Sequence, residues 1–232
     1  MIAAELRGYL RDEDRLTSSA FGLLQYLPFD RGFLFADGVY EVTAVYNAQL
    51  VDMDRHLDRL DRSLQERQYG TLPDRQELEE VHRKLVSDNQ VTEGYVYLQV
   101  TRGAYGARDF VAPDKPRLTC FAYAEARALI DTPSARNGSR VVSMPDIRWA
   151  RRDIKSVGLL AQAMAKTEAK ARGADDAWLV APDRFVTEGA SSNAWIVTKD
   201  GEVVTRALSN SILAGITRHA LFDALGQQGR KI

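Results

Sequence analysis

Asp146-Ile-Arg-Trp-Ala-Arg-Arg-Asp-Ile-Lys-Ser-Val-Gly-Leu-Leu160 is the stretch from which the rest of the sequence can be interpreted. It places Lys155 in a short apolar context, with Ile154 before it and Val157 after it. Burial penalises a lysine cation, so a lysine in such a place loses its proton readily. The neutral amine is a nucleophile toward aldehydes, which is the chemistry of Schiff-base enzymes. Taken alone, a lysine near apolar residues is more often one whose amine reaches solvent.

Two further motifs follow this stretch along the chain. Val186-Thr-Glu-Gly-Ala-Ser-Ser-Asn193 places the carboxylate of Glu188 before a glycine and two hydroxyl residues. Leu213-Ala-Gly-Ile-Thr-Arg218 reads as a helix start, and the backbone N–H groups at a helix N-terminus favour anions such as phosphate. Read singly, Glu188 is also compatible with a surface carboxylate, and Gly215 with an ordinary helix start. The order of amine, carboxylate and anion-binding turn is more specific than any one of them.

Composition limits the classes of protein to consider. The chain has 232 residues, 45% of them hydrophobic, which is enough for one large domain or two small ones. Its 31 basic and 32 acidic residues leave a net charge of −1, so there is no electrostatic case for nucleic acid or an anionic membrane. The single cysteine, Cys120, excludes an internal disulfide and fits a reducing compartment. We expect a cytoplasmic protein with neither a signal peptide nor a membrane helix, and no metal site.

The first part of the chain, residues 1–123, is expected to be a small α/β domain. Residues 1–28 are hard to interpret: they show no strand hairpin, and their leucines fit a helix only poorly. From there on the pattern is clear, with strands predicted over 39–46, 95–101 and 118–123, a hairpin turn at 47–49, and amphipathic helices over 54–64 and 74–89. Alternating strands and helices of this kind predict an α/β or α+β lobe.

The second part of the chain is expected to begin after a linker at residues 124–138, which contains turn signals such as Asn137-Gly138. Residues 139–232 form the second predicted domain. Its strands are predicted at 140–143, 177–180, 194–198 and 202–205, with a turn at 199–201. A helix over 158–172 is expected to end at Gly173.

Together the motifs resemble those of the fold type IV pyridoxal-phosphate enzymes, most closely the D-amino acid transaminases. The resemblance covers roughly residues 29–226 and is carried by the three motifs above and by Asp37-Gly-Val-Tyr-Glu-Val42. It implies an α/β (α+β) subunit of two lobes, with pyridoxal 5'-phosphate in the interlobe cleft, and a homodimer. Family members continue with further strands after the Gly-Ile-Thr-Arg helix, so we expect the carboxyl lobe to be incomplete.

The resemblance also implies roles for single residues. Lys155 would be the catalytic residue: it would form the internal aldimine with the cofactor and move the proton between the substrate α-carbon and the cofactor. Glu188 would face the ring nitrogen, because the ring withdraws electrons only if that nitrogen can carry positive charge. Gly189 would let the backbone approach the ring closely.

Other residues would hold the cofactor in place. The amides of Ile216 and Thr217 and the Thr217 hydroxyl would bind its phosphate, together with Arg59. Leu213 would back the ring, and Tyr40 would lie near the cofactor and the substrate. Ser191 and Ser192 would offer hydroxyl and amide groups. For Arg59 a solvated helix arginine is the plain alternative, and for Tyr40 a core tyrosine.

Substrate recognition is the least determined part of the prediction. Some D-amino acid transaminases bind the substrate α-carboxylate with an Arg-x-His pair in the loop after Thr-Arg-Gly. In this chain the loop contains Arg108-Asp-Phe110, so the arginine is present and the histidine is absent. We expect Arg108 to bind the carboxylate.

The predicted reaction is transamination of D-amino acids with 2-oxo acids, such as D-alanine with 2-oxoglutarate. Same-fold alternatives are an (R)-selective amine transaminase, which needs no carboxylate trap, and a branched-chain L-amino acid aminotransferase. Against the latter stands Glu188-Gly-Ala-Ser-Ser-Asn193 where those enzymes tend to have Glu-Gly-x-Gly-Glu-Asn. The motifs of aminodeoxychorismate lyase fit less well, and a non-catalytic relative is a further alternative.

Overall fold

The computed structural model describes residues 9–12, 15–16, 27–70, 74–105 and 108–229. The chain divides into two compact units. Unit 1 comprises residues 1–130 and 155–158, and unit 2 comprises residues 131–154 and 159–232. Because each unit has its own core, each is described by itself. Among the described residues, no helix is both long and apolar enough to span a membrane.

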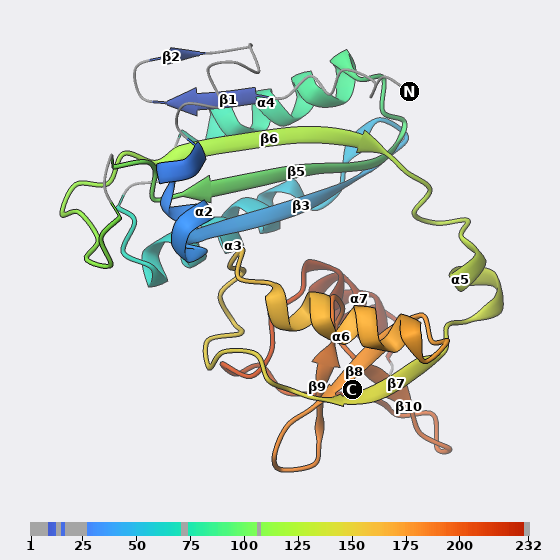
Figure 1. The fold of residues 1–232 in the computed structure, drawn as a ribbon. Coiled ribbons are helices and arrows are strands. Elements are labelled where there is room, and N and C mark those ends of the chain that lie inside the picture. The colour runs from blue at the N-terminus through green and yellow to red at the C-terminus, as the bar shows by residue number, and fades with distance from the viewer. Residues whose placement is uncertain (1–8, 13–14, 17–26, 71–73, 106–107, 230–232) are drawn as a thin grey trace. The chain divides into compact units, whose positions relative to one another are not determined.

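Unit 1 is built on a six-stranded antiparallel sheet (Figure 1). The strand order is β2-β1-β6-β5-β3-β4. The bounds are β1 Tyr9–Asp12, β2 Arg15–Leu16, β3 Gly38–Tyr46, β4 Gln49–Leu50, β5 Glu93–Thr101 and β6 Thr119–Ala126. A 3-10 helix, η1 Leu27–Phe29, and a short helix, α2 Arg31–Phe35, precede β3. The predicted hairpin turn is confirmed, since Asn47 and Ala48 have positive φ values of 50° and 58°.

Two helices cover one face of this sheet, as Figure 1 shows. They are α3 Met53–Glu66 and α4 Arg75–Asp88, which confirms the two predicted helices. Strand alternation sends every second side chain of β3, β5 and β6 toward them. The buried apolar residues of this core are Val39, Val45, Val96, Leu98, Val100, Ala122 and Ala124 from the sheet and Leu57, Leu60, Leu64, Leu78, Leu85 and Val86 from the helices.

The opposite face of the sheet carries tyrosines in a continuous row. Tyr97 stacks on Tyr40 at 5.6 Å and on Tyr123 at 5.2 Å between ring centroids. These side chains are only partly buried, in contrast to the apolar residues that alternate with them. The sheet therefore has one face that forms a core and one aromatic face that no helix covers among the described residues of unit 1.

The expectation that residues 1–28 hold no strand hairpin is wrong for the part that the structure describes. β1 and β2 pair antiparallel, with Arg11 opposite Leu16, and β1 extends the sheet along β6, with Tyr9 opposite Ala122. The leucines considered for a helix in this segment are Leu6, Leu10 and Leu16. Leu10 lies in β1 and Leu16 in β2, and Leu6 lies outside the described residues. The second partner of β1, β6, is more than a hundred positions away along the chain, so local pattern alone gives little sign of that pairing.

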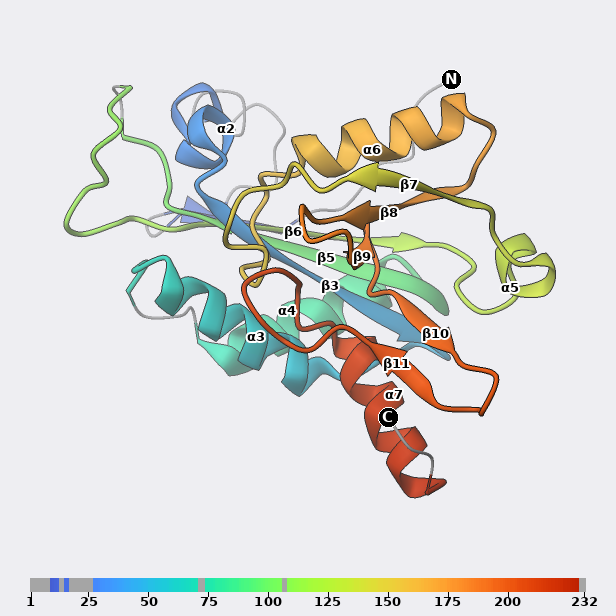
Figure 2. The ribbon, with the colours of Figure 1, turned by 90° about the horizontal axis from the view of Figure 1, so that it is seen from below.

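Unit 2 contains a three-stranded sheet in the order β7-β8-β9, with α6 packed over β7 and β8 (Figure 2). The bounds are β7 Val141–Pro145, α6 Leu160–Ala171, β8 Asp176–Val180 and β9 Val186–Gly189. β7 and β8 are parallel, so their connection through α6 is a βαβ unit. Its core consists of small residues and one leucine: Ala165, Ala169, Ala174, Ala177, Leu179 and Ala190.

The remaining elements of unit 2 are a hairpin and two helices. The hairpin pairs β10 Trp195–Val197 with β11 Val203–Thr205, and the helices are α5 Pro133–Asn137 and α7 Ile216–Gln227. The predicted turn at 199–201 is confirmed, because Gly201 has a φ of 79° and Thr198 donates to the Glu202 carbonyl. Gly173 ends α6 as predicted, with a φ of 72°.

Candidate active site

Lys155 lies on a four-residue segment that pairs with β3. The amide of Tyr40 donates to the Lys155 carbonyl at 3.0 Å, and the amide of Val157 donates to the Gly38 carbonyl at 3.0 Å. Residues 155–158 therefore group with unit 1, although residues 131–154 and 159–232 form unit 2. The sequence analysis included residues 155–158 in the predicted second domain, 139–232. Their pairing with β3 could not be predicted from local sequence pattern.

The amine of Lys155 lies over the ring of Tyr40. Nζ is 4.2 Å from the ring centroid, within the range of a cation–π contact. Burial, and then the charge of Glu41, raise the pKa of the Tyr40 hydroxyl, so it stays a neutral phenol at physiological pH. Gly38 lies close to this segment: a Cβ there would be 3.1 Å from Val157 Cγ2, so a larger residue would press on Val157. The structure thus brings the predicted lysine and tyrosine together in unit 1.

Arg59 is buried rather than solvated, and it is held by a carboxylate. From α3 its Nε donates to Oε1 of Glu41 at 2.8 Å and one of its outer nitrogens donates to Oε2 at 2.7 Å. His56 Nδ1 lies 2.7 Å from the same Oε2. Burial works against the charge on Glu41, but the bonds from Arg59 and His56 outweigh it and lower the pKa of Glu41. Sequence reasoning did not assign Glu41, whose place on the buried side of β3 was the available signal.

We expect Glu41→Gln to destabilise the fold, because it removes the carboxylate that pairs with the buried Arg59 guanidinium. Removing one partner of a buried ion pair costs about 3 kcal/mol or more, which urea unfolding would measure. The folded pKa of Glu41 is lowered, so the stabilisation is present near neutral pH and is lost as the pH falls below the unfolded value. Glu79→Gln, which breaks an exposed pair with Arg83, is the control. Equal, small losses for both variants would contradict the expectation.

Glu188 is the centre of a buried network in unit 2. Oε1 accepts from Arg148 at 2.5 Å, Oε2 accepts from the Asn193 amide group at 2.9 Å, and the Leu213 amide lies 3.2 Å from Oε2. Burial raises the pKa of Glu188, against the effect of Arg148. Asn193 also donates to the Leu213 carbonyl, at 2.9 Å, and so joins the β9 loop to the segment before α7.

Arg148 was not assigned a role from sequence, although it lies in the opening motif. Its Nε and one outer nitrogen donate to the Asp146 carboxylate at 2.9 and 2.8 Å, and Thr187 donates to the same carboxylate at 2.7 Å. Arg148 is therefore fixed by Asp146 on one side and reaches Glu188 on the other. The spacing Asp-x-Arg in the motif was the signal for such a fork, but its second partner is forty positions away in the sequence.

The start of α7 has the features of an anion-binding turn. Its N-cap is Gly215, and among the described residues no side chain caps the helix and no acidic side chain lies in its first turn. A Cβ on Gly215 would overlap Oδ1 of Asn193, so glycine is required for this close approach. Thr217 is exposed and Ile216 is buried, which leaves the hydroxyl of Thr217 accessible.

The loop after Glu188 is closed by a short backbone bond. Gly189 donates to the Ser192 carbonyl at 2.7 Å, and a Cβ on Gly189 would overlap the Ser192 hydroxyl. The residue that lies closest to Gly189 in the structure is thus Ser192 of the same loop. Ser191 and Ser192 are both exposed on this loop.

Arg108 lies exposed in unit 1 over two aromatic rings. Its guanidinium carbon is 5.2 Å from the centroid of Phe35 and 4.9 Å from that of Phe110. Phe110 occupies the position at which the resemblance leads one to look for a histidine. The cation is therefore oriented by apolar surfaces.

Comparisons with known proteins agree with these features. The family model of the class IV amino-transferases matches residues 38–232. A D-alanine aminotransferase of Listeria monocytogenes is 39% identical over 201 residues, which are 86% of this chain and 69% of that protein. A fold IV transaminase from Curtobacterium pusillum is 27% identical, with a TM-score of 0.79, over 97% of this chain and 81% of that one.

A hypothetical aminotransferase from Mycobacterium tuberculosis, solved in its PLP-bound form, covers 96% of this chain and 79% of that one with a TM-score of 0.79. At 20% identity this likeness shows the fold alone. The fold is thus that of the type IV transaminases, as the sequence predicts. The chain belongs to the class IV aminotransferase family, and it is an enzyme that transfers amino groups.

Proposed function

We propose that this protein transfers the amino group of D-amino acids to 2-oxo acids with pyridoxal 5'-phosphate as cofactor. The observation that carries the proposal is the backbone pairing of Lys155 with Tyr40 of β3, which places the Lys155 amine 4.2 Å from the Tyr40 ring centroid. The D-alanine aminotransferase relative and the match to the class IV amino-transferase family support both D-alanine as a substrate and the cofactor of such enzymes.

The residues of each unit fit this cofactor by the chemistry of their donors. Unit 1 offers an amine, Lys155, and a buried guanidinium, Arg59, that Glu41 holds in one orientation. Unit 2 offers a buried carboxylate, Glu188, and the uncapped start of α7. An amine for an aldehyde, a carboxylate for a ring nitrogen, and a cation and helix N-terminus for a phosphate are the groups that the cofactor requires.

When bound, pyridoxal phosphate supplies an aldehyde for covalent capture and a ring that withdraws electrons from the substrate. Lys155 would bind the cofactor aldehyde, and its Nζ would take the proton from the substrate α-carbon. Glu188 would hold a proton on the ring nitrogen while Arg148 and Asn193 keep its carboxylate in place. The amides of Ile216 and Thr217, the Thr217 hydroxyl and Arg59 would bind the phosphate. Leu213, Ser191 and Ser192 would line the ring and its phosphate side, as proposed from sequence.

The experiment that tests the proposal is a set of half-reactions. The protein loaded with pyridoxal phosphate is mixed with D-alanine, L-leucine or (R)-phenylethylamine, and the visible absorbance of the bound cofactor is followed. The expected result is that D-alanine converts the cofactor fastest and that (R)-phenylethylamine converts it more slowly but measurably. Faster conversion by L-leucine would favour a branched-chain enzyme, and no conversion by any of the three would favour a non-catalytic relative.

An (R)-selective amine transaminase is the second candidate, and one observation favours it. Arg108 is flanked by Phe35 and Phe110, so the predicted carboxylate trap contains one cation beside apolar rings. Such a surface suits the aryl group of an amine as well as a carboxylate. Conversion by (R)-phenylethylamine at the rate of D-alanine would support this candidate.

Arg108→Ala should raise the KM for D-alanine, because the substrate carboxylate loses a charged hydrogen-bonding partner. The loss is worth roughly 1.5–3 kcal/mol, whereas the KM for (R)-phenylethylamine should change little. Steady-state kinetics on both substrates measure the difference. Lys115→Ala, which removes another exposed cation of the same connection between β5 and β6, is the matched control. Equal losses on both substrates would show that Arg108 only supports the loop.

We also propose that the protein acts as a homodimer in the cytoplasm, as the family resemblance implies. Light scattering coupled to size exclusion would give the mass of the particle in solution. A monomer mass at the concentrations used for kinetics would contradict the dimer.

A further inference from the structure

The connection between β5 and β6 carries Arg108, and a second arginine fixes the course of the three residues that follow it, 109–111. Arg31, the first residue of α2, is buried. One of its outer nitrogens donates to the carbonyl of Asp109 at 2.6 Å and lies 3.4 Å from that of Val111. The other donates to the carbonyl of Phe110 at 3.1 Å. The three residues that follow Arg108 are therefore all held by one guanidinium.

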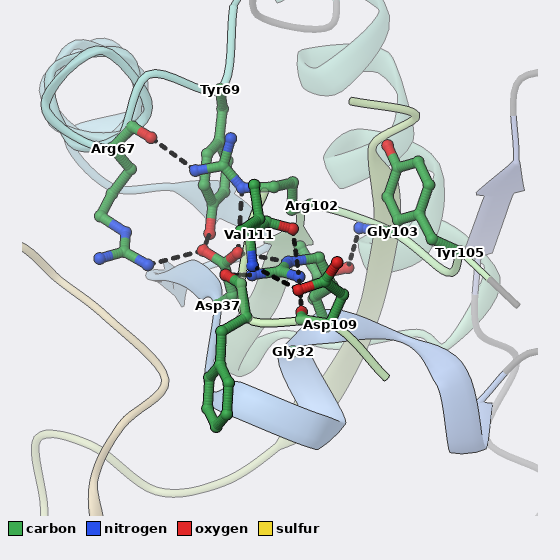
Figure 3. Close-up of polar contacts among 12 residues, drawn as sticks. Gly32, Asp37, Arg67, Tyr69, Arg102, Gly103, Tyr105, Asp109 and Val111 are labelled. Atoms are coloured by element: carbon green, nitrogen blue, oxygen red, sulfur yellow. Dashed lines mark hydrogen bonds and ion pairs between the residues drawn. The ribbon is translucent and has the colours of Figure 1, made fainter. Parts of the chain in front are cut away.

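Arg31 is itself anchored on Asp37. Its Nε donates to Oδ2 of Asp37 at 2.9 Å, and Figure 3 shows Arg67, Tyr69 and Arg102 converging on the same carboxylate. Burial opposes the charge on Asp37, but the bonds from Tyr69 and the arginines hold its pKa well below its usual range. The anchor is thus a permanent anion at any pH at which the enzyme works.

The arginines around Asp37 differ in what else they reach. Arg102 donates to the carbonyls of Arg67 and Gln68, at 2.7 and 3.3 Å, and so ties the anchor to the end of α3. Arg67 donates to Oδ1 of Asp37 at 2.6 Å. Arg31 carries the bonds that lead from Asp37 to residues 109–111. Bonds from a charged donor to carbonyls are stronger than neutral ones, and a planar guanidinium fixes their directions.

Arg31 and Arg108 also share an aromatic ring. The guanidinium carbon of Arg31 is 4.8 Å from the centroid of Phe35, and that of Arg108 is 5.2 Å from the same centroid. Phe35 contacts Phe110 in turn, at 5.2 Å between centroids. The backbone after Arg108 and the side chain of Arg108 are consequently placed by the same short helix, α2.

We propose that Arg31 is a positioning residue that sets the orientation of Arg108 and thereby the affinity for the substrate carboxylate. This inference rests on the proposed function, in which Arg108 meets that carboxylate. Arg31 binds the backbone oxygens of residues 109–111, and the amide of Val111 donates to Oδ1 of Asp109 at 3.0 Å. The course of this stretch therefore depends chiefly on the Arg31 guanidinium, which makes three of these bonds.

The test compares Arg31→Lys with Arg67→Lys, two identical changes next to the same carboxylate. Both keep a cation beside Asp37, but a lysine at position 31 lacks the fork that spans Asp37 and the loop carbonyls. Arg31→Lys should raise the KM for D-alanine roughly tenfold, the lower range for loss of a bond to a charged group. The KM for (R)-phenylethylamine and the kcat should stay unchanged, and Arg67→Lys should resemble the parent.

Amide hydrogen exchange of residues 108–111 supplies a readout that is independent of turnover. Exchange there should be faster in Arg31→Lys and unchanged in Arg67→Lys, while β3 and β5 remain protected in both. If Arg31→Lys does not fold, Phe35→Leu tests the same linkage, since it leaves the bonds to Asp37 intact and removes the ring that the two arginines share. It should raise the KM for D-alanine selectively.

The outcomes separate this inference from the function on which it rests. Unchanged loop exchange in Arg31→Lys, equal effects of the two lysine variants, or equal KM increases for D-alanine and the amine would overturn the role of Arg31. In the fallback variant, an unchanged KM for D-alanine would do the same. A parent enzyme that does not convert D-alanine would overturn the proposed function, and loop exchange would still decide whether Arg31 holds residues 109–111.

Discussion

Lys155→Ala should abolish transamination and the covalent capture of the cofactor together. The amine serves two purposes in the proposed reaction, as the group that binds the cofactor aldehyde and as the base at the substrate α-carbon. A positioned acid–base group alone contributes about 10²–10⁴ in rate, and the loss of covalent capture adds to that. Alanine removes the side chain but keeps the backbone bonds of residue 155 to β3, so the fold should persist.

Two measurements check this result. One is turnover of D-alanine, and the other is borohydride reduction followed by mass spectrometry, which in the parent should leave the cofactor on the peptide that contains Lys155. Lys166→Ala is the matched control, because that lysine lies on α6 and pairs only loosely with Asp176, at 3.6 Å. Parent-like turnover by Lys155→Ala would end the proposal, as would a cofactor adduct on another lysine of the parent.

Glu188→Gln is expected to have the second largest effect. The cofactor should still bind, because the start of α7 and Arg59 are untouched. The proton transfer should slow by about 10²–10⁴, since the ring nitrogen loses the anion that stabilises its positive charge. The amide also disturbs its surroundings, because Arg148, Asn193 and the Leu213 amide all donate toward this side chain and an NH₂ group cannot accept.

Stopped-flow half-reactions with D-alanine, deuterated and unlabelled at the α-carbon, would measure the effect on the proton-transfer step itself. Titration of the variant with pyridoxal phosphate would show that binding is retained. Glu168→Gln, at an exposed carboxylate of α6 that pairs with Arg172, is the control for the loss of one negative charge. A Glu188→Gln variant with the parent rate would mean that another group faces the ring nitrogen.

Local sequence pattern was sufficient for the regular elements of the fold. The alternation in β3 and β5 and the leucine spacing of α3 and α4 predicted those elements within a few residues, because each buries one face against the same core. The hairpin of β1 and β2 and the seat of Lys155 were not predicted. The place of β1 beside β6 and that of the Lys155 segment beside β3 depend on pairing with strands far away in the sequence, and such pairing leaves no local periodicity. The pairing of β1 with β2 is local, but these strands have only four and two residues, too few for a clear alternation.

The candidate site shows the same division. The motifs single out Lys155, Glu188 and Arg59. In the structure each has a defined neighbour: Tyr40 beside Lys155, Arg148 beside Glu188 and Glu41 beside Arg59. Glu41 and Arg148, which hold Arg59 and Glu188 in place, were not singled out. A charged residue that orients another one is visible only when the two side chains are brought together, and the pairs here are 18 and 40 positions apart.

The pairing of the Lys155 segment with β3 matters for the construction of chimeras between this enzyme and its relatives. The lysine lies in sequence between the two segments of unit 2, but the backbone that it pairs with, at Gly38 and Tyr40, is encoded more than a hundred codons earlier. A graft that exchanges residues 131–232 as one block would import a foreign lysine segment onto a native strand. A chimera should therefore take residues 38–40 and 155–158 from the same parent, even though more than a hundred codons separate the two segments.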